Sequence, residues 1–147
     1  METPAAADVV LHLLVVGFHH TKGNCIEFVY PTGVDLEHPP PGWDAIPFIA
    51  LPDGVHAFDH DYVLFTTPPL PEDAAKHGLV GSTLYGVSCY RQVKADATLK
   101  AADATVTRYA APLRVRSLTQ APSSSIQKAV VALSRYPLLG AIQVACR

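Results

Sequence analysis

Histidine is the residue type that most suggests chemistry in this sequence, because seven of the 147 residues are His. His56 and His60 are four residues apart, and Asp59 and Asp61 flank His60, so the residue types are those that bind zinc. A turn sequence precedes this pair and a strand pattern follows it, so no helix places both rings on one face. A zinc site needs three or four ligands held in place. The sequence therefore predicts no metal ion and no cofactor.

Patterns for nucleophilic catalysis are also missing. The sequence holds neither a Gly-x-Ser-x-Gly elbow nor a phosphate-binding glycine loop, and we expect no catalytic residue and no enzyme. Cys25 and Cys89 lie in strand patterns, where a free cysteine packs as a small apolar side chain. Together with Cys146 they are odd in number and far apart, and no secretory signal is visible. We therefore expect three reduced thiols in a cytoplasmic protein.

A few polar residues are candidates for contact with a protein partner. Asp53 and Gly54 lie in a turn sequence, Arg91 and Gln92 lie near the end of a predicted strand, and Lys128 lies near the start of another. The ordinary interpretation of Arg91 and Gln92 is a solvated strand end, and the same interpretation stays open for Lys128. These five residues are the partner-contact hypothesis that the sequence supports.

The first long apolar run determines how the rest of the chain must be arranged. Val9 to Phe18 is apolar except for His12, and a continuous run rich in Val and Leu is typical of a strand covered on both faces. A polar turn follows, and Cys25 to Tyr30 alternates as a second strand that ends at Pro31. We predict a hairpin whose first strand lies at the centre of a sheet.

Further short apolar runs predict more strands than helices. The predicted strands are Tyr62–Thr66, Thr83–Val93 and Ile126–Ser134. Gly86 and Ser88 share one face of the second of these and leave room for a helix against it. We expect a short helix near Pro47, an irregular loop at Leu70–Ser82 and a helix that begins at Pro137. The fold class is α+β, a mainly antiparallel sheet of about five strands with helices on both faces.

Composition and charge exclude several classes of protein. Apolar residues make up 49% and charged residues 16% of the chain, which is a folding composition. The formal net charge of −2 gives no electrostatic footprint for nucleic acid. The ten-residue run from Val9 to Phe18 is too short to cross a bilayer, which takes about 20 residues. We expect a flexible stretch at 1–8, a single domain at 9–147, and peripheral membrane association at most.

Four segments resemble one family of trafficking proteins, and they occur in the same order as in that family. The segments are VVGFHHTKGNCIEFVYP from Val15, IPFIALPDGVH from Ile46, YGVSCYRQV from Tyr85 and IQKAVVALSRYPLLG from Ile126. Together they are similar to the start of the Avl-nine late secretory pathway proteins, a branch of the DENN-domain superfamily. The resemblance reaches from near the first residue almost to the last.

The resemblance implies a fold and a role that the composition alone does not. It implies a longin-like, or upstream-DENN, domain at the N-terminus of a vesicle-trafficking protein. It further implies a contribution to Rab GTPase binding and guanine-nucleotide exchange, together with the remaining DENN portion. The expected location is the cytoplasm, with recruitment to Golgi or secretory vesicle membranes. The alternative is a longin-like interaction scaffold without exchange activity.

Two features depart from the family pattern. About a dozen additional residues around 109–123 precede the QKAV segment, as an insertion loop or as an error in the gene prediction. The chain also ends at Arg147, little more than two turns after Pro137, so we expect a closing helix that is cut short. A short amphipathic helix is marginal without packing.

Overall fold

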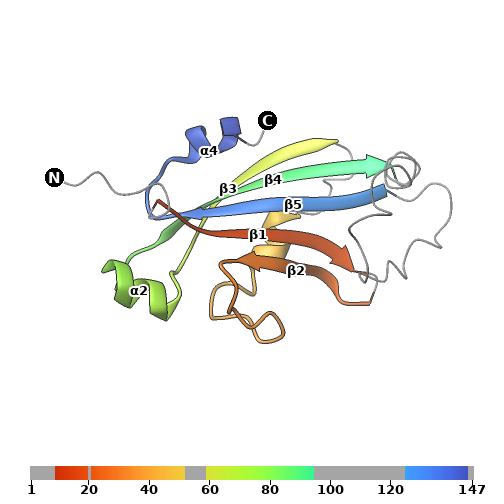
Figure 1. Cartoon of the computed structure of the whole chain (residues 1–147). Coiled ribbons are helices and arrows are strands. Elements are labelled where there is room, and N and C mark those ends of the chain that lie inside the picture. Colours follow the sequence, from red (N-terminus) through yellow and green to blue (C-terminus); the bar gives the residue numbers. More distant parts are fainter. Residues whose placement is uncertain (1–8, 20, 52–58, 95–124, 146–147) are drawn as a thin grey trace, which may run out of the picture.

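The computed structural model describes residues 9–19, 21–51, 59–94 and 125–145 (Figure 1). Its strands and helices follow the chain in this order: β1 (Val10–His19), β2 (Gly23–Tyr30), α1 (Ile46–Ala50), β3 (His60–Thr67), α2 (Pro71–His77), β4 (Leu84–Lys94), β5 (Ser125–Ser134) and α4 (Leu139–Ala145). All five predicted strands are confirmed, with ends that differ from the prediction by two residues at most.

The five strands form one antiparallel sheet in the order β2-β1-β5-β4-β3. The predicted hairpin of β1 and β2 is present, and Leu14 pairs with Val29. The central strand is β5, however, so the prediction that β1 lies at the centre is wrong. β5 enters between β1 and β4 from far along the chain, and Leu14 also pairs with Val131. An apolar run indicates that a strand has a neighbour on each side, but it does not indicate which of the five positions in the sheet the strand occupies.

The main core lies on one side of the sheet, here called the inner face, which is packed against α1. Trp43, Ile46 and Ala50 are fully buried there with inner-face residues such as Leu14 and Val16. Ser88 lets α1 approach β4, and its hydroxyl donates a hydrogen bond to the carbonyl of Ala50 at 3.2 Å. The predicted close approach of a helix to this face of β4 is therefore confirmed at Ser88.

The helix α2 replaces the irregular loop predicted over Leu70–Ser82. Pro71 starts the helix, where its missing N–H costs nothing, and Glu72 and Asp73 lie in the positively polarised first turn. Gly78 ends it with a φ of 65°, a left-handed conformation that suits glycine. The prediction was wrong because the helix is short and shows no apolar period, although its start and stop signals are present in the sequence.

The helix α4 lies against the other side of the sheet, here called the outer face. It contacts β4, and Val87, Cys89 and Ala132 are buried there although none belongs to the inner core. Helices on both faces are thus confirmed. The prediction that β1 is covered on both faces is wrong, because the outer-face side chain of Leu13 is 43% exposed. A continuous apolar run does not distinguish a buried strand from one with an uncovered apolar side.

The five-stranded antiparallel sheet and three short helices of the described residues form an α+β fold that is consistent with a longin-like domain. Several predictions concern residues outside the described part of the chain. These are the flexible stretch at 1–8, the turn at Pro52–Gly54 and the insertion around 109–123.

Candidate functional site

The outer face presents two consecutive rows of apolar side chains that cross all five strands. The strand registers place the members of each row side by side. From β3 to β2, the first row is Tyr62, Cys89, Val130, Val15 and Phe28, and the second is Leu64, Val87, Ala132, Leu13 and Tyr30. Helix α4 covers the part of these rows that lies on β4, and the flanks are left open.

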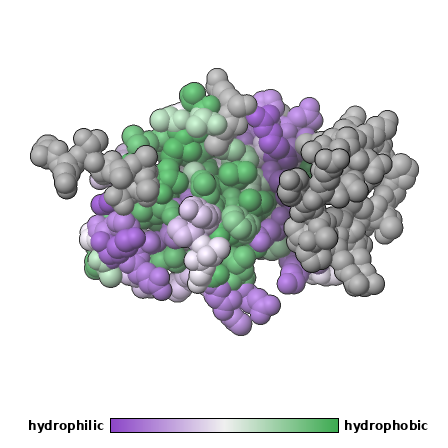
Figure 2. Space-filling model, in the orientation of Figure 1, coloured by the Kyte–Doolittle hydropathy of each residue, from purple (hydrophilic) through white to green (hydrophobic). Residues whose placement is uncertain are grey.

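Five large apolar side chains of these rows remain exposed to solvent. We call them the outer apolar face, and their exposed fractions lie between 43% and 60%: Leu13, Phe28, Tyr30, Leu64 and Val130. Figure 2 shows a broad hydrophobic area over the sheet with hydrophilic margins. A contiguous apolar area of this kind on a folded protein marks an interaction surface.

A polar row borders the outer apolar face and contains two of the residues predicted from the sequence. Arg91 on β4 and Lys128 on β5 are direct cross-strand partners, so the structure brings them together. The Lys128 ammonium donates hydrogen bonds to the carboxylate of Glu27 on β2, reaching across Gly17 on β1. Lys128 is 44% and Glu27 34% exposed, so this ion pair lies at the surface.

The structure separates Gln92 from those two residues. Successive strand residues point to opposite faces, and Gln92 shares its face with Tyr90. The Gln92 side-chain oxygen accepts hydrogen bonds from the Tyr90 hydroxyl at 2.8 Å and from the Gln127 amide at 3.3 Å. Burial, and secondarily the charge of Asp59, raises the pKa of Tyr90. Gln92 thus belongs to a half-buried polar network on the inner face. The predicted contact residues Asp53 and Gly54 lie outside the described residues.

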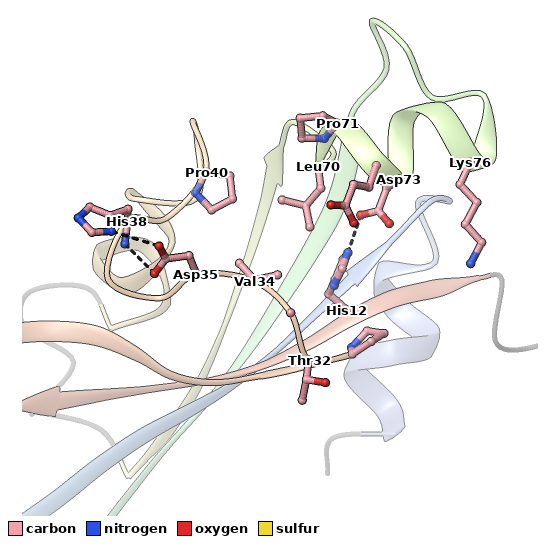
Figure 3. A pocket seen from close by; sticks show the side chains of 13 residues that line it. His12, Thr32, Val34, Asp35, His38, Pro40, Leu70, Pro71, Asp73 and Lys76 are labelled. Atoms are coloured by element: carbon pink, nitrogen blue, oxygen red, sulfur yellow. Dashed lines mark hydrogen bonds and ion pairs between the residues drawn. The ribbon is translucent and has the colours of Figure 1, made fainter.

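A second feature is a cavity of about 390 Å³ on the inner side, which we call the α2 pocket (Figure 3). β1, the segment 31–40 and helix α2, from the preceding Leu70 to Lys76, line it. Its floor carries His12, 6% exposed, whose Nε2 lies 2.5 Å from a carboxylate oxygen of Asp73. The rings of His12 and Trp43 form a T-shaped pair, with 5.1 Å between centroids and 82° between planes. This site was not predicted from the sequence, although His12 is the only polar residue in its apolar run.

Two acidic groups stand at the mouth of the α2 pocket. Glu72 is exposed on the first turn of α2, and Asp35 is exposed on the facing segment. A hydrogen bond with the His38 side chain, and then bonds from the backbone N–H groups of Glu37 and His38, lower the pKa of Asp35. Asp35 therefore stays ionised and contributes a fixed negative charge at the opening.

The cysteines depart from the sequence-based expectation. Cys25 is a free thiol, and burial, followed by the charge of Glu27, raises its pKa. Cys89 is disulfide-bonded, so the prediction of a reduced thiol at this position is wrong. An odd count still leaves room for one pair, and separation along the chain says nothing of distance in the fold. Cys146 lies outside the described residues.

Metal binding and membrane insertion are two further possibilities for the described ranges. No group of three or more His, Cys, Asp or Glu side chains in them could hold a metal ion. His60 lies on β3 opposite Arg91, and its predicted neighbour His56 is outside the described part. No helix within the described residues is long and apolar enough to cross a membrane.

Comparison with known proteins places the chain in a family. The family model described as "Transport protein Avl9" matches residues 10–146. The chain is 36% identical to "Late secretory pathway protein avl9" of Schizosaccharomyces pombe over 97% of its own length and 25% of that relative. It is 33% identical to "Late secretory pathway protein AVL9" of Saccharomyces cerevisiae over 92% of its length and 17% of that relative. No solved structure matches it. The match over nearly the whole chain shows that it belongs to the Avl9 transport protein family.

Proposed function

We propose that this chain is a GTPase-binding module of a late secretory transport protein, and that it contributes to guanine-nucleotide exchange on a Rab-type GTPase. The observation that carries the proposal is the outer apolar face, five large side chains on four strands that are 43–60% exposed. Membership of a family whose relatives are named for the late secretory pathway supports the choice of partner.

The outer apolar face has the chemistry that a switch region of a GTPase would meet. Aromatic residues are enriched at protein interfaces, and Phe28 and Tyr30 stand beside the aliphatic Leu13 and Val130. The polar row with Arg91 and Lys128 borders this area and would lie at the rim, where charges set orientation and association rate.

Nucleotide exchange makes no demand for a catalytic acid, base or metal in the exchange factor. The factor binds the GTPase in a conformation with distorted switch loops, and this lowers the affinity for nucleotide. This chain spans a quarter or less of the curated relatives. We therefore assign one GTPase-binding surface to this chain and the second GTPase-binding surface to the remaining DENN portion. The module acts in the cytoplasm and reaches Golgi or secretory vesicle membranes as a peripheral protein.

The test is binding and nucleotide release measured over a panel of Rab GTPases. A protein that holds this chain together with the remaining DENN portion should accelerate the release of fluorescent GDP from at least one Rab. Phe28→Ser on the outer apolar face should weaken binding about tenfold, since truncated aromatic contacts at interface centres cost at least that much. Phe48→Ser is the matched control, because Phe48 is 66% exposed on α1, away from the outer face.

The results also separate exchange from the scaffold alternative. Binding that Phe28→Ser weakens, without faster release by the longer protein, would favour a scaffold that uses the same surface. Equal effects of Phe28→Ser and Phe48→Ser would contradict the assignment of the outer apolar face.

A further inference from the structure

We propose that the α2 pocket binds the guanidinium group of an arginine side chain presented by a partner protein. The pocket lies on the inner side of the sheet, and the proposal does not depend on GTPase binding by the outer apolar face. Three properties of the pocket carry it: the balance of charge, the buried hydrogen-bonding groups and the shape of the walls.

The charge balance of the pocket favours a cation. Its lining holds the carboxylates of Asp35, Glu72 and Asp73 against one ammonium, that of Lys76. These three carboxylates and one ammonium sum to a formal charge of −2, in a chain whose formal net charge, counted without His, is also −2. Asp73 is 15% exposed and lies deep, so its charge is poorly screened by water. An anionic ligand would meet these carboxylates, whereas a cation is attracted to all three.

The buried polar groups of the pocket offer acceptors for hydrogen bonds. Asp73 accepts from His12 Nε2, so neutral His12 carries its proton on Nε2 and leaves Nδ1 as an acceptor. That Nδ1 atom is buried and has no hydrogen-bond partner in the part of the chain that the structure describes. In Figure 3 the His12 side chain points from β1 into the pocket toward Asp73 on α2.

The ligand's own contact would be with Asp73, whose carboxylate can accept further hydrogen bonds beyond the one from His12, because the sealed Nδ1 atom is out of reach. Guanidinium has five N–H donors in a planar fork and no acceptor, so every polar contact it makes here is favourable. It can bond a carboxylate in bidentate fashion and still direct an N–H elsewhere. A lysine ammonium lacks the fork, which is why we assign arginine.

The shape of the pocket suits a side chain with an apolar stem. Val34, Leu70 and Pro40 supply apolar wall between the rim and the floor. The cavity of about 390 Å³ is at the small end of ligand pockets, which span roughly 300–1,000 Å³. The methylene stem of an arginine would pass these walls while its head reaches Asp73.

The experiment measures binding of capped arginine to the chain by NMR chemical-shift titration. The probes are Nα-acetyl-arginine methylamide, its neutral citrulline analogue, a capped Gly-Arg-Gly peptide and free methylguanidinium. We expect both capped arginine probes to bind and to shift the indole signal of Trp43, the single tryptophan, through its contact with His12. Citrulline should bind about tenfold more weakly, because charge-assisted hydrogen bonds are lost.

Variants locate the binding and distinguish it from a loss of folding. Asp73→Asn and Glu72→Gln should each weaken arginine binding by about tenfold. Lys76→Ala should tighten it about twofold, because a competing cation is removed, and damage to the fold cannot produce that result. Asp44→Asn makes the same charge change at an exposed residue outside the pocket and should have no effect.

Three results would overturn the proposal. These are equal binding of arginine and citrulline, equal effects of Asp73→Asn and Asp44→Asn, and binding of methylguanidinium without binding of the capped peptide. The last result would show that the pocket does not admit a side chain attached to a backbone.

Discussion

At the scale of single residues, two glycines on the sheet make room for neighbours of very different stiffness. A Cβ at Gly17 would overlap a carboxylate oxygen of Glu27 and lie 2.7 Å from the ammonium of Lys128. A Cβ at Gly86 would lie 2.5 to 2.7 Å from three ring atoms of Phe65. The first pair can swing into solvent, whereas Phe65 is packed against the core.

We therefore expect Gly86→Ala to destabilise the fold by about 1–3 kcal/mol, the usual cost of overpacking. Gly17→Ala should cost about 1 kcal/mol or less, because it disturbs only a surface ion pair. Urea denaturation followed by the fluorescence of Trp43, which is fully buried, measures both values. A larger loss for Gly17→Ala than for Gly86→Ala would contradict this account.

The thiol of Cys25 gives a second prediction at this scale. Burial and then the charge of Glu27 raise its pKa, so less thiolate is present near pH 8 than for an ordinary cysteine. Because the thiolate is the reactive form, alkylation of Cys25 should be slower than alkylation of a model thiol. Glu27→Gln should make the alkylation of Cys25 faster. The variant removes a negative charge that raises the pKa and leaves Lys128, whose charge lowers it. Peptide mass spectrometry against pH measures the rate, and an unchanged or slower rate in Glu27→Gln would refute the cause.

At the scale of elements, the glycine that caps α2 and the glycine in the first turn of α4 have opposite roles. Gly78 ends α2 with a φ of 65°, and a Cβ there would have no atom within 4 Å, so only the backbone conformation opposes a side chain. Gly140 lies in the first turn of α4, also without a close neighbour, and its backbone does not take a positive φ.

Alanine at these two glycines should therefore shift stability in opposite directions. Gly78→Ala should destabilise by about 1 kcal/mol, since L residues pay that much in the left-handed region. Gly140→Ala should stabilise by about 0.5 kcal/mol or less, because the full helix-propensity difference of about 1 kcal/mol applies to a helix interior. Thermal denaturation of the two variants side by side gives the comparison, and a shift in the same direction for both would contradict it.

The elements that the sequence predicts well are those whose own residues show an apolar pattern, either alternating or continuous. β3 and β4 alternate or run apolar between turn residues, and their bounds were predicted within two residues. The order of strands was not predictable in this way, because the pairing of Leu14 with Val131 joins distant residues that no local pattern links. The α2 pocket was missed for the same reason, since His12 and Asp73 are 61 residues apart.

The predicted contact residues also show that a local sequence pattern does not reveal which distant residues become neighbours. Arg91 and Lys128 both came from strand ends, and only the register of β4 with β5 makes them neighbours. Gln92, adjacent in sequence to Arg91, was grouped with it, yet strand alternation turns it to the half-buried polar network with Tyr90. The outer apolar face is likewise a property of register, because its residues come from four separate strands.

At the scale of the whole molecule, the outer apolar face determines how this chain behaves by itself. Leu13, Phe28 and Tyr30 form an open apolar flank beside the part of the sheet that α4 covers. Such a surface favours self-association of the chain in water. Self-association would cover the surface that a GTPase needs, so the two kinds of binding are expected to compete. The oligomeric state of the free chain should therefore be determined by sedimentation before GTPase binding is measured.

The final prediction is that this chain alone does not accelerate nucleotide release from any Rab. Prying open a nucleotide site takes contacts on both sides of the switch loops, and the chain spans only 25% and 17% of two of its curated relatives. A binder with one surface has little differential affinity for the nucleotide-free state, so it can bind without shifting that equilibrium. Release of fluorescent GDP should stay at the intrinsic rate with this chain and rise with a protein that includes the remaining portion. Phe28→Ser is the control for self-association: it should make the chain less prone to self-associate, and release of GDP should still stay at the intrinsic rate. Full exchange by the short chain would show that one surface is sufficient.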